Sequence, residues 1–445
     1  MKTVNKSSNF FSVIIFLIIL STQAGYSQKL NILVYGADPS GVSDNTGIIN
    51  ALIDSLSKGD GGTVIIPEGK YLLHDALILK SNVSIEGEGV QKTILFRNPE
   101  VGNWNSSKSQ AIITTDPSVV NESISVSNLS IEAAYKKKEL KAKGGICLRN
   151  CTNSKISKVE TSNTWHGVAF YDFKGANSGN IIQDVTSLNA HAFTTENNSG
   201  RSRGILTTDF GTKVINSTSK GAGTGFYANG KDISFEGCRA ENWFEDNGYY
   251  LIVDNLIVKD CIAKGGPSPE KGFGSGFAIA YKKNGLIQNS QAINCSNYGF
   301  RIHVPQSDTK LINNEAIGCG IGFGIETASH PFPEVSERIE FTNNVAEKSG
   351  LYGFLFRQMS NSKVVGNKAI NGNQRGLTLS TRGAIALKEY LSNNEFSKNN
   401  CIDNQAMKTQ LFGIYDYSVD QISSASKKGK NNKISHKSSN GKDVF

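Results

Sequence analysis

The chain has 445 residues, of which 38% are hydrophobic and 19% are charged, so it can bury a large core and is not disordered as a whole. Glycine is unusually frequent, at 45 residues against 9 prolines, which favours many short strands and tight turns and argues against a helical bundle. The formal net charge of +8 favours an anionic partner.

The first 27 residues have the order of a secretory signal peptide. Lys2 and Lys6 precede the apolar run Phe10–Leu20, and Gly25-Tyr26-Ser27 supplies small residues at the cleavage spacing. This run is too short to span a bilayer, and none of the apolar runs after it is long enough to do so. We therefore expect a secreted or periplasmic monomer without a membrane span, whose partner is not nucleic acid.

Residues 33–73 combine tight turns with one amphipathic stretch. The stretch Ile48–Leu56 predicts a short helix, capped by Asp44 or Asn45 and ended by Gly59. For Asp38 and Asp44 we expect turn and cap roles rather than a metal site. Together with Gly-Gly-Thr-Val-Ile-Ile-Pro-Glu-Gly-Lys-Tyr from Gly61, the segment closely resembles the opening of the pectate-lyase-like superfamily of right-handed parallel β-helix proteins. The resemblance implies a helix over the open end of a solenoid and a carbohydrate-active class, without naming a substrate.

One pattern then recurs along the chain: glycine, apolar, any residue, apolar, any residue. Six of the nine intervals between its copies are 21 to 23 residues long, and a second short apolar pattern follows, as at Ile233–Phe235. Short strands at this spacing, without a helical period between them, predict an all-β, parallel β-helix over residues 28–426 with a short N-terminal capping helix. The ten copies begin at Gly145, Gly167, Gly204, Gly225, Gly248, Gly276, Gly299, Gly322, Gly353 and Gly376.

The seven cysteines are odd in number and scattered, which argues against a disulfide scaffold and a zinc site. Cys238 and Cys261 are 23 residues apart, and Cys295 and Cys319 are 24 apart, so we expect interior stacks of small apolar thiols. Residues 427–445 are rich in lysine and serine and predict a loose basic tail.

The second and fourth positions after each repeat glycine should point outward, because strand side chains alternate. Stacked coils would bring these positions to about 4.8 Å from one another, in one column. The column contains Arg149, Tyr171, Tyr227, Asn229, Tyr250, Arg301, His303, Glu326 and Arg357, and Asp172, Asp209, Tyr281 and Lys282 come next along their strands.

The middle of this column is the candidate site. Ala278 and Ala280 on one side and Gly324 on the other would leave room for a bound group beside Arg301 and His303. Insertions at 191–202, 266–275 and 328–337 would form the walls of a groove. We predict that the catalytic residues are Arg301, His303, Tyr250 and Tyr281, and that the substrate-binding residues are Lys282, Arg357, Glu326, Tyr227, Asp172 and Asp209.

These side chains suit proton abstraction next to a carboxylate. Arg301 or Arg357 would neutralise the carboxylate, and His303, with an ordinary pKa near 6.5, would act as the base. Tyr250 or Tyr281 would protonate the departing glycosidic oxygen. The set is similar to the Arg, His and Tyr groups of uronate-processing β-helix lyases and mannuronan epimerases, which implies a polysaccharide lyase acting on an acidic, uronate-containing polysaccharide.

Three alternatives stay open. A glycoside hydrolase would use paired carboxylates, such as Asp172 and Asp209 with Glu326 or Asp254, but the motifs of polygalacturonase-type hydrolases are absent. A C5-epimerase is less favoured because the sequence lacks Asp-Pro-His. A non-catalytic glycan-binding solenoid would need a long, even aromatic strip. No cofactor is certain, and calcium stays open because members of the resembled superfamily often use it.

Overall fold

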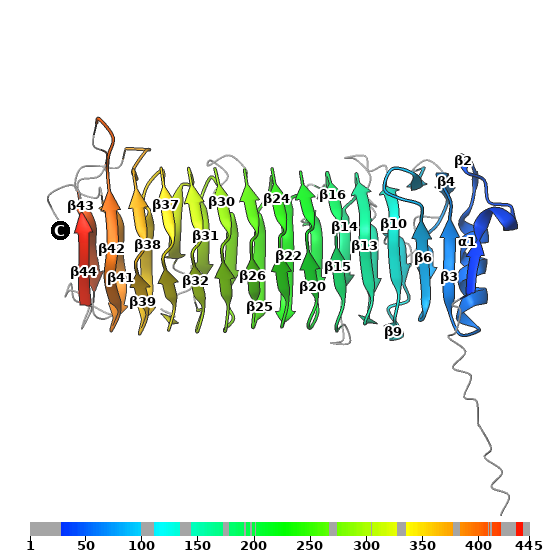
Figure 1. Cartoon of the computed structure of the whole chain (residues 1–445), viewed down its shortest axis with the longest axis horizontal. Helices are drawn as coiled ribbons and strands as arrows, with labels where there is room; N and C mark the ends of the chain where they lie inside the picture. The colour runs from blue at the N-terminus through cyan, green and yellow to red at the C-terminus, as the bar shows by residue number, and fades with distance from the viewer. Residues whose placement is uncertain are drawn as a thin grey trace, which may run out of the picture.

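The computed structural model is an elongated solenoid of parallel strands with a helix at its N-terminal end (Figure 1). It describes residues 28–98, 111–133, 144–171, 178–190, 193–195, 198–200, 202–266, 274–303, 305–326, 335–376, 383–407, 409, 412–419 and 433–438. The expected signal peptide, residues 1–27, lies outside these ranges. Strands of successive coils stack in two long sheets of 26 and 14 strands, so the predicted right-handed parallel β-helix is confirmed.

The N-terminal end of the core is covered by α1 (Thr46–Ser57). This helix buries Ile49, Leu52, Ile53 and Leu56 and contacts β3 (Gly62–Ile66) and β5 (Leu77–Leu79). It carries one apolar face that needs a partner, and the open end of a solenoid exposes an apolar core, so each covers the other. The predicted capping helix is therefore confirmed.

Both aspartates of this segment organise turns, as expected. The Asp44 carboxylate accepts a hydrogen bond from the Thr46 N–H (2.9 Å), and Asp38 accepts from the N–H groups of Ser40 (2.9 Å) and Ser43 (2.8 Å). These bonds hold the pKa of Asp38 well below its ordinary value, so the carboxylate stays charged in its turn.

The smaller sheet carries the glycine repeat, and nine of the ten predicted copies lie at one of its strands. The tenth, at Gly376, is wrong. Gly376 sits in a turn with φ of 70°, and Ile385 of the following strand pairs with Phe354. From the N-terminal end the sheet comprises β5, β8 (Ala111–Thr115), β11 (Gly144–Arg149), β14 (His166–Tyr171), β19 (Arg203–Thr208), β22 (Thr224–Lys231), β25 (Tyr249–Asp254), β28 (Phe277–Ala280), β31 (Tyr298–His303), β34 (Ile321–Glu326), β38 (Phe354–Ser360), β41 (Gly383–Ser392) and β43 (Phe412–Val419), and the short β35 (Ser336–Glu337) also pairs with β38.

The larger sheet receives two short strands from most coils, where the second apolar pattern was predicted. In the middle of the solenoid they are β23 (Ser234–Glu236) and β24 (Arg239–Glu241), β26 (Ile257–Lys259) and β27 (Ile262–Lys264), β29 (Leu286–Gln288) and β30 (Gln291–Ile293), β32 (Lys310–Ile312) and β33 (Glu315–Ile317), β36 (Glu340–Thr342) and β37 (Val345–Glu347), and β39 (Lys363–Val365) and β40 (Lys368–Ile370).

Close packing between the two sheets explains the repeat glycine. A Cβ atom on Gly322 would lie 2.5 Å from the Cβ of Ala346 in β37, and one on Gly299 would lie 2.7 Å from that of Ala316 in β33. Carbon atoms need about 3.5 Å or more, so only glycine allows the two walls to approach here.

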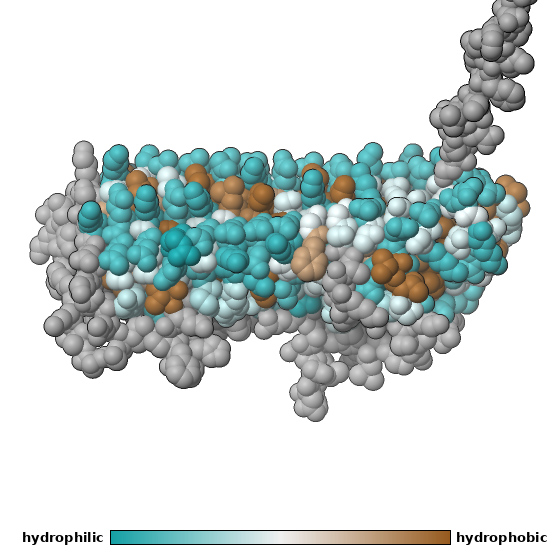
Figure 2. All heavy atoms as spheres, turned by 90° about the horizontal axis from the view of Figure 1, so that it is seen from below, coloured by the Kyte–Doolittle hydropathy of each residue, from teal (hydrophilic) through white to brown (hydrophobic). Residues whose placement is uncertain are grey.

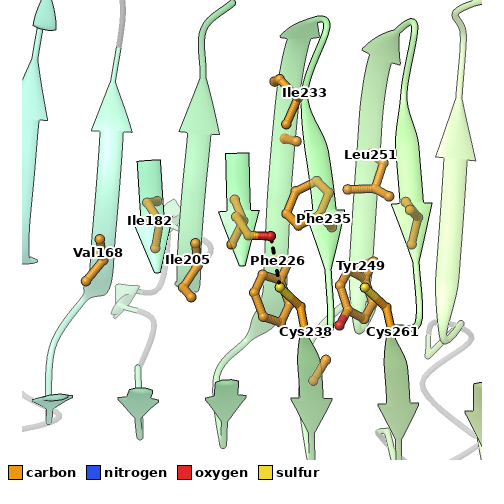
Figure 3. Close-up of a cluster of buried hydrophobic side chains, with 14 of the residues drawn as sticks. Val168, Ile182, Ile205, Phe226, Ile233, Phe235, Cys238, Tyr249, Leu251 and Cys261 are labelled. Atoms are coloured by element: carbon orange, nitrogen blue, oxygen red, sulfur yellow. Dashed lines mark hydrogen bonds between the residues drawn. The ribbon is translucent and has the colours of Figure 1, made fainter. Parts of the chain in front are cut away.

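A continuous aromatic stack fills the core behind the smaller sheet, as predicted. The ring centroids of Phe277, Phe300, Phe323 and Phe354 follow one another at 4.7, 4.8 and 5.1 Å with nearly parallel planes. Tyr249 extends the stack at 4.5 Å and lies beside Phe226 (Figure 3). Each coil thus buries one ring on the ring of the next coil, which is how a solenoid assembles its core.

Buried cysteine and asparagine side chains stack on one another at the turns of successive coils. All seven cysteines are buried and free, and Cys238 and Cys261 occupy equivalent places before β24 and β27 (Figure 3), so the expected thiol stacks are confirmed. Burial raises the pKa of the Cys261 thiol well above its ordinary value. Asparagine amides form a second ladder, linked by Nδ2–Oδ1 distances of 3.0, 3.0 and 3.1 Å along Asn314, Asn344, Asn367 and Asn399.

The C-terminal boundary differs from the prediction. β44 (Lys433–Ser438) pairs in parallel with β42 (Glu395–Ile402), with Ile434 next to Phe396. This part of the expected basic tail therefore extends the larger sheet. In the part of the chain that the structure describes, no helix is long and apolar enough to cross a membrane.

Candidate functional site

Two columns of outward side chains run along the smaller sheet. The backbone register between neighbouring strands determines which residues are adjacent in each column. In the first, Tyr227 pairs with Tyr250, Tyr250 with Ala278, and Ala278 with Arg301. In the second, Ala280 pairs with His303, and His303 with Glu326. Apart from the two alanines, these side chains are partly exposed, as the predicted column requires.

An ion pair lies at the centre of the face. Nη2 of Arg301 pairs with Oε2 of Glu326 from the next coil, and the two side chains are only 14% and 29% exposed. The Arg301 guanidinium also lies 5.8 Å from the ring centroid of Tyr298. Its Nε–H is buried and donates no hydrogen bond to any described residue. The guanidinium is therefore a partly exposed cation that is already paired with a carboxylate.

His303 lies between two tyrosine rings, with centroid distances of 6.3 Å to Tyr250 and 5.9 Å to Tyr281. Burial, and then the positive charge of Arg301, lower the pKa of His303 to about 3. The expectation of an ordinary pKa is thus wrong for the ligand-free protein, in which the imidazole is neutral near pH 7.

The small residues beside this cluster do not leave the space that we expected. Ala278 and Ala280 are 0% exposed. On the other side, a Cβ on Gly324 would lie 2.6 Å from Cε1 of Tyr298, so the Tyr298 ring occupies that place. The space expected beside Arg301 and His303 is therefore not open in this structure.

The opening instead lies where these strands end and the chain turns away from the sheet. A groove of about 530 Å³ is lined there by residues that include Asp254, Tyr281, Lys282, Gln306, Glu337 and Arg338. Tyr281 belongs to both places, since its ring neighbours His303 and also lines the groove. Its side chain is 46% exposed, and its φ of 56° is rare for a large residue. The tyrosine thus connects the cluster to open solvent.

Of the other predicted site residues, some lie at the groove and some lie away from it. Lys282 lines the groove, with Nζ 3.7 Å from Oδ2 of Asp254. Tyr227 lies below the Arg203 guanidinium, 3.9 Å from its ring centroid, and Arg357 is half-buried on β38.

The two aspartates of the hydrolase alternative do not form a described pair. Asp209 is 1% exposed and accepts a hydrogen bond from the Thr212 hydroxyl, so its assignment as substrate-binding is wrong: it closes a turn. Asp172 lies outside the described residues.

The insertions are described only in part. The first contains the hairpin of β17 (Phe193–Thr195) and β18 (Asn198–Gly200), whereas residues 267–273 and 327–334 lie outside the described ranges. The predicted groove walls therefore stay a prediction.

A third column was missed, at the position before the repeat glycine, where Tyr298, Ile321 and Tyr352 are buried in a cluster separate from the main core. His166 and Arg203 are neighbours in this column, and the His166 ring stacks on Trp165 at 4.1 Å. Burial, and then Arg203, lower the pKa of His166 to about 3. Tyr298 occupies the same position beside the Arg301 cluster. The inward-facing glycine interrupts the simple alternation, so the residue before it packs outside the main core.

No group of three or more His, Cys, Asp or Glu side chains is placed to hold a metal ion in the described ranges.

The fold and the site together define the class of this chain: it is a right-handed parallel β-helix protein with a polar cluster and groove on its smaller sheet.

Comparison with known families agrees with this class. The right handed beta helix region matches residues 203–338, and the family described as rhamnogalacturonase A/epimerase, pectate lyase-like, matches residues 30–261. The chain belongs to this pectate lyase-like family.

Individual relatives match only parts of the chain. Alginate lyase 7 of Azotobacter vinelandii is 33% identical over 112 residues, which is 24% of this chain and 13% of that protein. Mannuronan C5-epimerase AlgE1 of the same organism is 39% identical over 72 residues, or 15% of this chain and 5% of that protein. Among solved structures, a tailspike protein double mutant of E. coli bacteriophage HK620, in complex with a pentasaccharide, has a TM-score of 0.63 at 11% identity. It covers 94% of this chain and 80% of that one, and it shows the fold alone.

Proposed function

We propose that this protein is an exported enzyme that cleaves an acidic, uronate-containing polysaccharide by β-elimination at Arg301, His303 and Tyr281. The observation that carries the proposal is the placement of a cation, a neutral imidazole and a phenol on one sheet face beside an open groove. The partial match to an alginate lyase supports the same substrate class.

The three groups divide the chemistry of the elimination. The uronate carboxylate accepts hydrogen bonds from Arg301, whose charge stabilises the negative charge that develops as the proton on the adjacent carbon leaves. His303 follows Arg301 by two positions on the same strand face, about 7 Å along the backbone, and accepts that proton. The C–O bond on the next carbon then breaks, and the Tyr281 hydroxyl donates a proton to the departing glycosidic oxygen.

The low pKa of His303 fits this sequence of events. In the free protein the imidazole is already unprotonated, as a base must be. A bound carboxylate brings a negative charge beside it, which opposes the effect of Arg301 and raises the pKa of His303. Substrate binding thus strengthens the base at the moment when it is needed.

Elimination leaves a double bond in the product, which absorbs at 235 nm. The wild-type protein should produce this absorbance on at least one polymer among polymannuronate, polyguluronate and polygalacturonate. His303→Ala should lower the rate by about 10²–10⁴-fold. Arg301→Lys should also lose activity, since a point charge cannot replace a planar fork of donors. His74→Ala is the matched control, because this histidine lies beside the N-terminal helix.

Other products would replace this proposal. Reducing ends without absorbance at 235 nm would indicate hydrolysis. Unbroken polymer with an inverted C5 centre by NMR would indicate epimerisation, which begins with the same proton removal and has a partial match among the relatives. Binding without any product would indicate a glycan-binding solenoid.

A further inference from the structure

Glu326 occupies the place that the proposed reaction gives to the substrate carboxylate. Its Oε2 atom pairs with Nη2 of Arg301, and neither side chain is more than 29% exposed. Glu326 ends β34 in the second outward column, where its register neighbour on the preceding coil is His303. A carboxylate of this chain therefore already lies on the cation, close to the proposed base, where a uronate has to bind.

This ion pair leaves Arg301 without two nitrogens that a ligand can use together. A guanidinium binds a carboxylate most strongly through two parallel N–H···O bonds, which need two of its three nitrogens. Nη2 holds Glu326, and Nε is buried. Every pair of nitrogens on Arg301 includes one of these two atoms. A uronate can thus bind in the bidentate mode only after the Glu326 carboxylate has moved away from Nη2.

The next coil offers a second cation to the displaced carboxylate. Gly324 of β34 pairs with Leu355 of β38. Glu326 lies two residues after the first and Arg357, which is half-buried, lies two residues after the second, so both belong to the same outer face. Adjacent strands are about 4.8 Å apart, a distance that these long side chains span. Glu326 can therefore leave Arg301 and still have a positive charge beside it.

We infer that Glu326 is a specificity-determining residue that acts as an internal competitor: a substrate carboxylate binds Arg301 in the bidentate mode only by displacing it. The inference rests on the proposed function, because it takes the uronate site at Arg301 as given. Exchange of one carboxylate for another gains little free energy by itself, so neighbouring sugars must supply the rest of the affinity. The site thus accepts a uronate within a longer chain and rejects free uronic acids.

The test compares two variants of Glu326 on uronates of different length. Affinities for galacturonate, mannuronate and their hexamers are measured by calorimetry with the full-length chain in the His303→Ala background, so that no saccharide is consumed. Glu326→Gln removes the competing charge at nearly constant shape and should bind each uronate about five- to tenfold more tightly, as expected for a partly exposed ion pair. Glu326→Asp keeps the charge but withdraws it by one methylene, so it should tighten binding by a smaller factor.

Two controls separate this competition from a general change of charge. Glu340→Gln removes a carboxylate paired with Lys310 on the larger sheet and should leave the affinities unchanged. Hexamers whose carboxylates have been reduced to alcohols should gain nothing from Glu326→Gln. Unchanged or weaker binding of the uronate hexamers by Glu326→Gln would overturn the inference while leaving the proposed function standing, and weaker binding would show that Glu326 positions Arg301 instead. If no uronate bound to any of these proteins, the uronate site itself would be wrong, and the inference would fail with it.

Discussion

The rings of Tyr281 and His303 lie 5.9 Å apart although they belong to different coils of the solenoid. Tyr281 follows the end of β28 with φ of 56°, and His303 ends β31 on the next coil. A tyrosine in the left-handed region costs about 1–2 kcal/mol, which the surrounding structure must offset. The geometry places a phenol beside an imidazole at the mouth of the groove, where the proposed chemistry needs a proton donor.

Tyr281→Asn should separate stability from activity. Asparagine tolerates a positive φ, so the variant should keep or raise the thermal midpoint, whereas loss of the phenol should lower turnover by about 10²–10⁴-fold. Thermal unfolding and initial rates at 235 nm measure the two effects. Tyr35→Asn, which changes an exposed tyrosine at the N-terminal end, serves as the control. Unchanged turnover in Tyr281→Asn would remove this residue from the mechanism.

The aromatic stack should carry much of the stability of the core. Phe300 is 0% exposed and stacked on both sides, so Phe300→Ala should lower the free energy of unfolding by about 3–5 kcal/mol. Phe210, at 43% exposure, offers the matched control, for which about 0.5 kcal/mol is expected. Chemical denaturation of both variants measures the difference. Equal losses would show that the register of the core, and with it the outward columns, is misplaced.

Stability should fall in acid because a buried histidine stays neutral. His166 has a pKa of about 3 in the folded chain but near 6.5 when unfolded, so below pH 6.5 only the unfolded chain binds this proton. The contribution is fully present above pH 6.5 and is lost as the pH falls toward 3. Between pH 7 and pH 5, wild type should lose up to about 2 kcal/mol more than His166→Asn. His74→Asn, at a partly exposed site, should behave like wild type, and an identical loss in His166→Asn would contradict the assignment.

Export stays a proposal from the first 27 residues. Cleavage near Ser27 should leave a mature chain that begins near Gln28, and mass spectrometry of protein secreted by its native host detects that terminus. Exported protein that retained Met1 would rule out this signal peptide.

The sequence alone determined the solenoid, its core and most of its register. A repeat of about 23 residues leaves one way to bury apolar strands, and the glycine at the start of each copy marks where the two walls touch, as at Gly322 and Ala346. The same register predicted the stack of phenylalanines and brought Arg301, His303 and Glu326 to one outer face. It failed at Gly376, because Ile385 occupies the strand position beside Phe354, and at β44, because a lysine-rich composition suggested a tail where the chain forms a strand.

Only the tertiary structure determined which site residues are charged, which are buried and where the site opens. The pKa of His303 depends on burial and on the nearby charge of Arg301, and no spacing of residues reports either quantity. The ion pair with Glu326, the Tyr298 ring over Gly324 and the burial of Asp209 are likewise contacts between side chains of different coils or turns. A repeat specifies which residues are neighbours, but the rotamers and the packing around them determine which groups are charged, which are covered and where a ligand can enter.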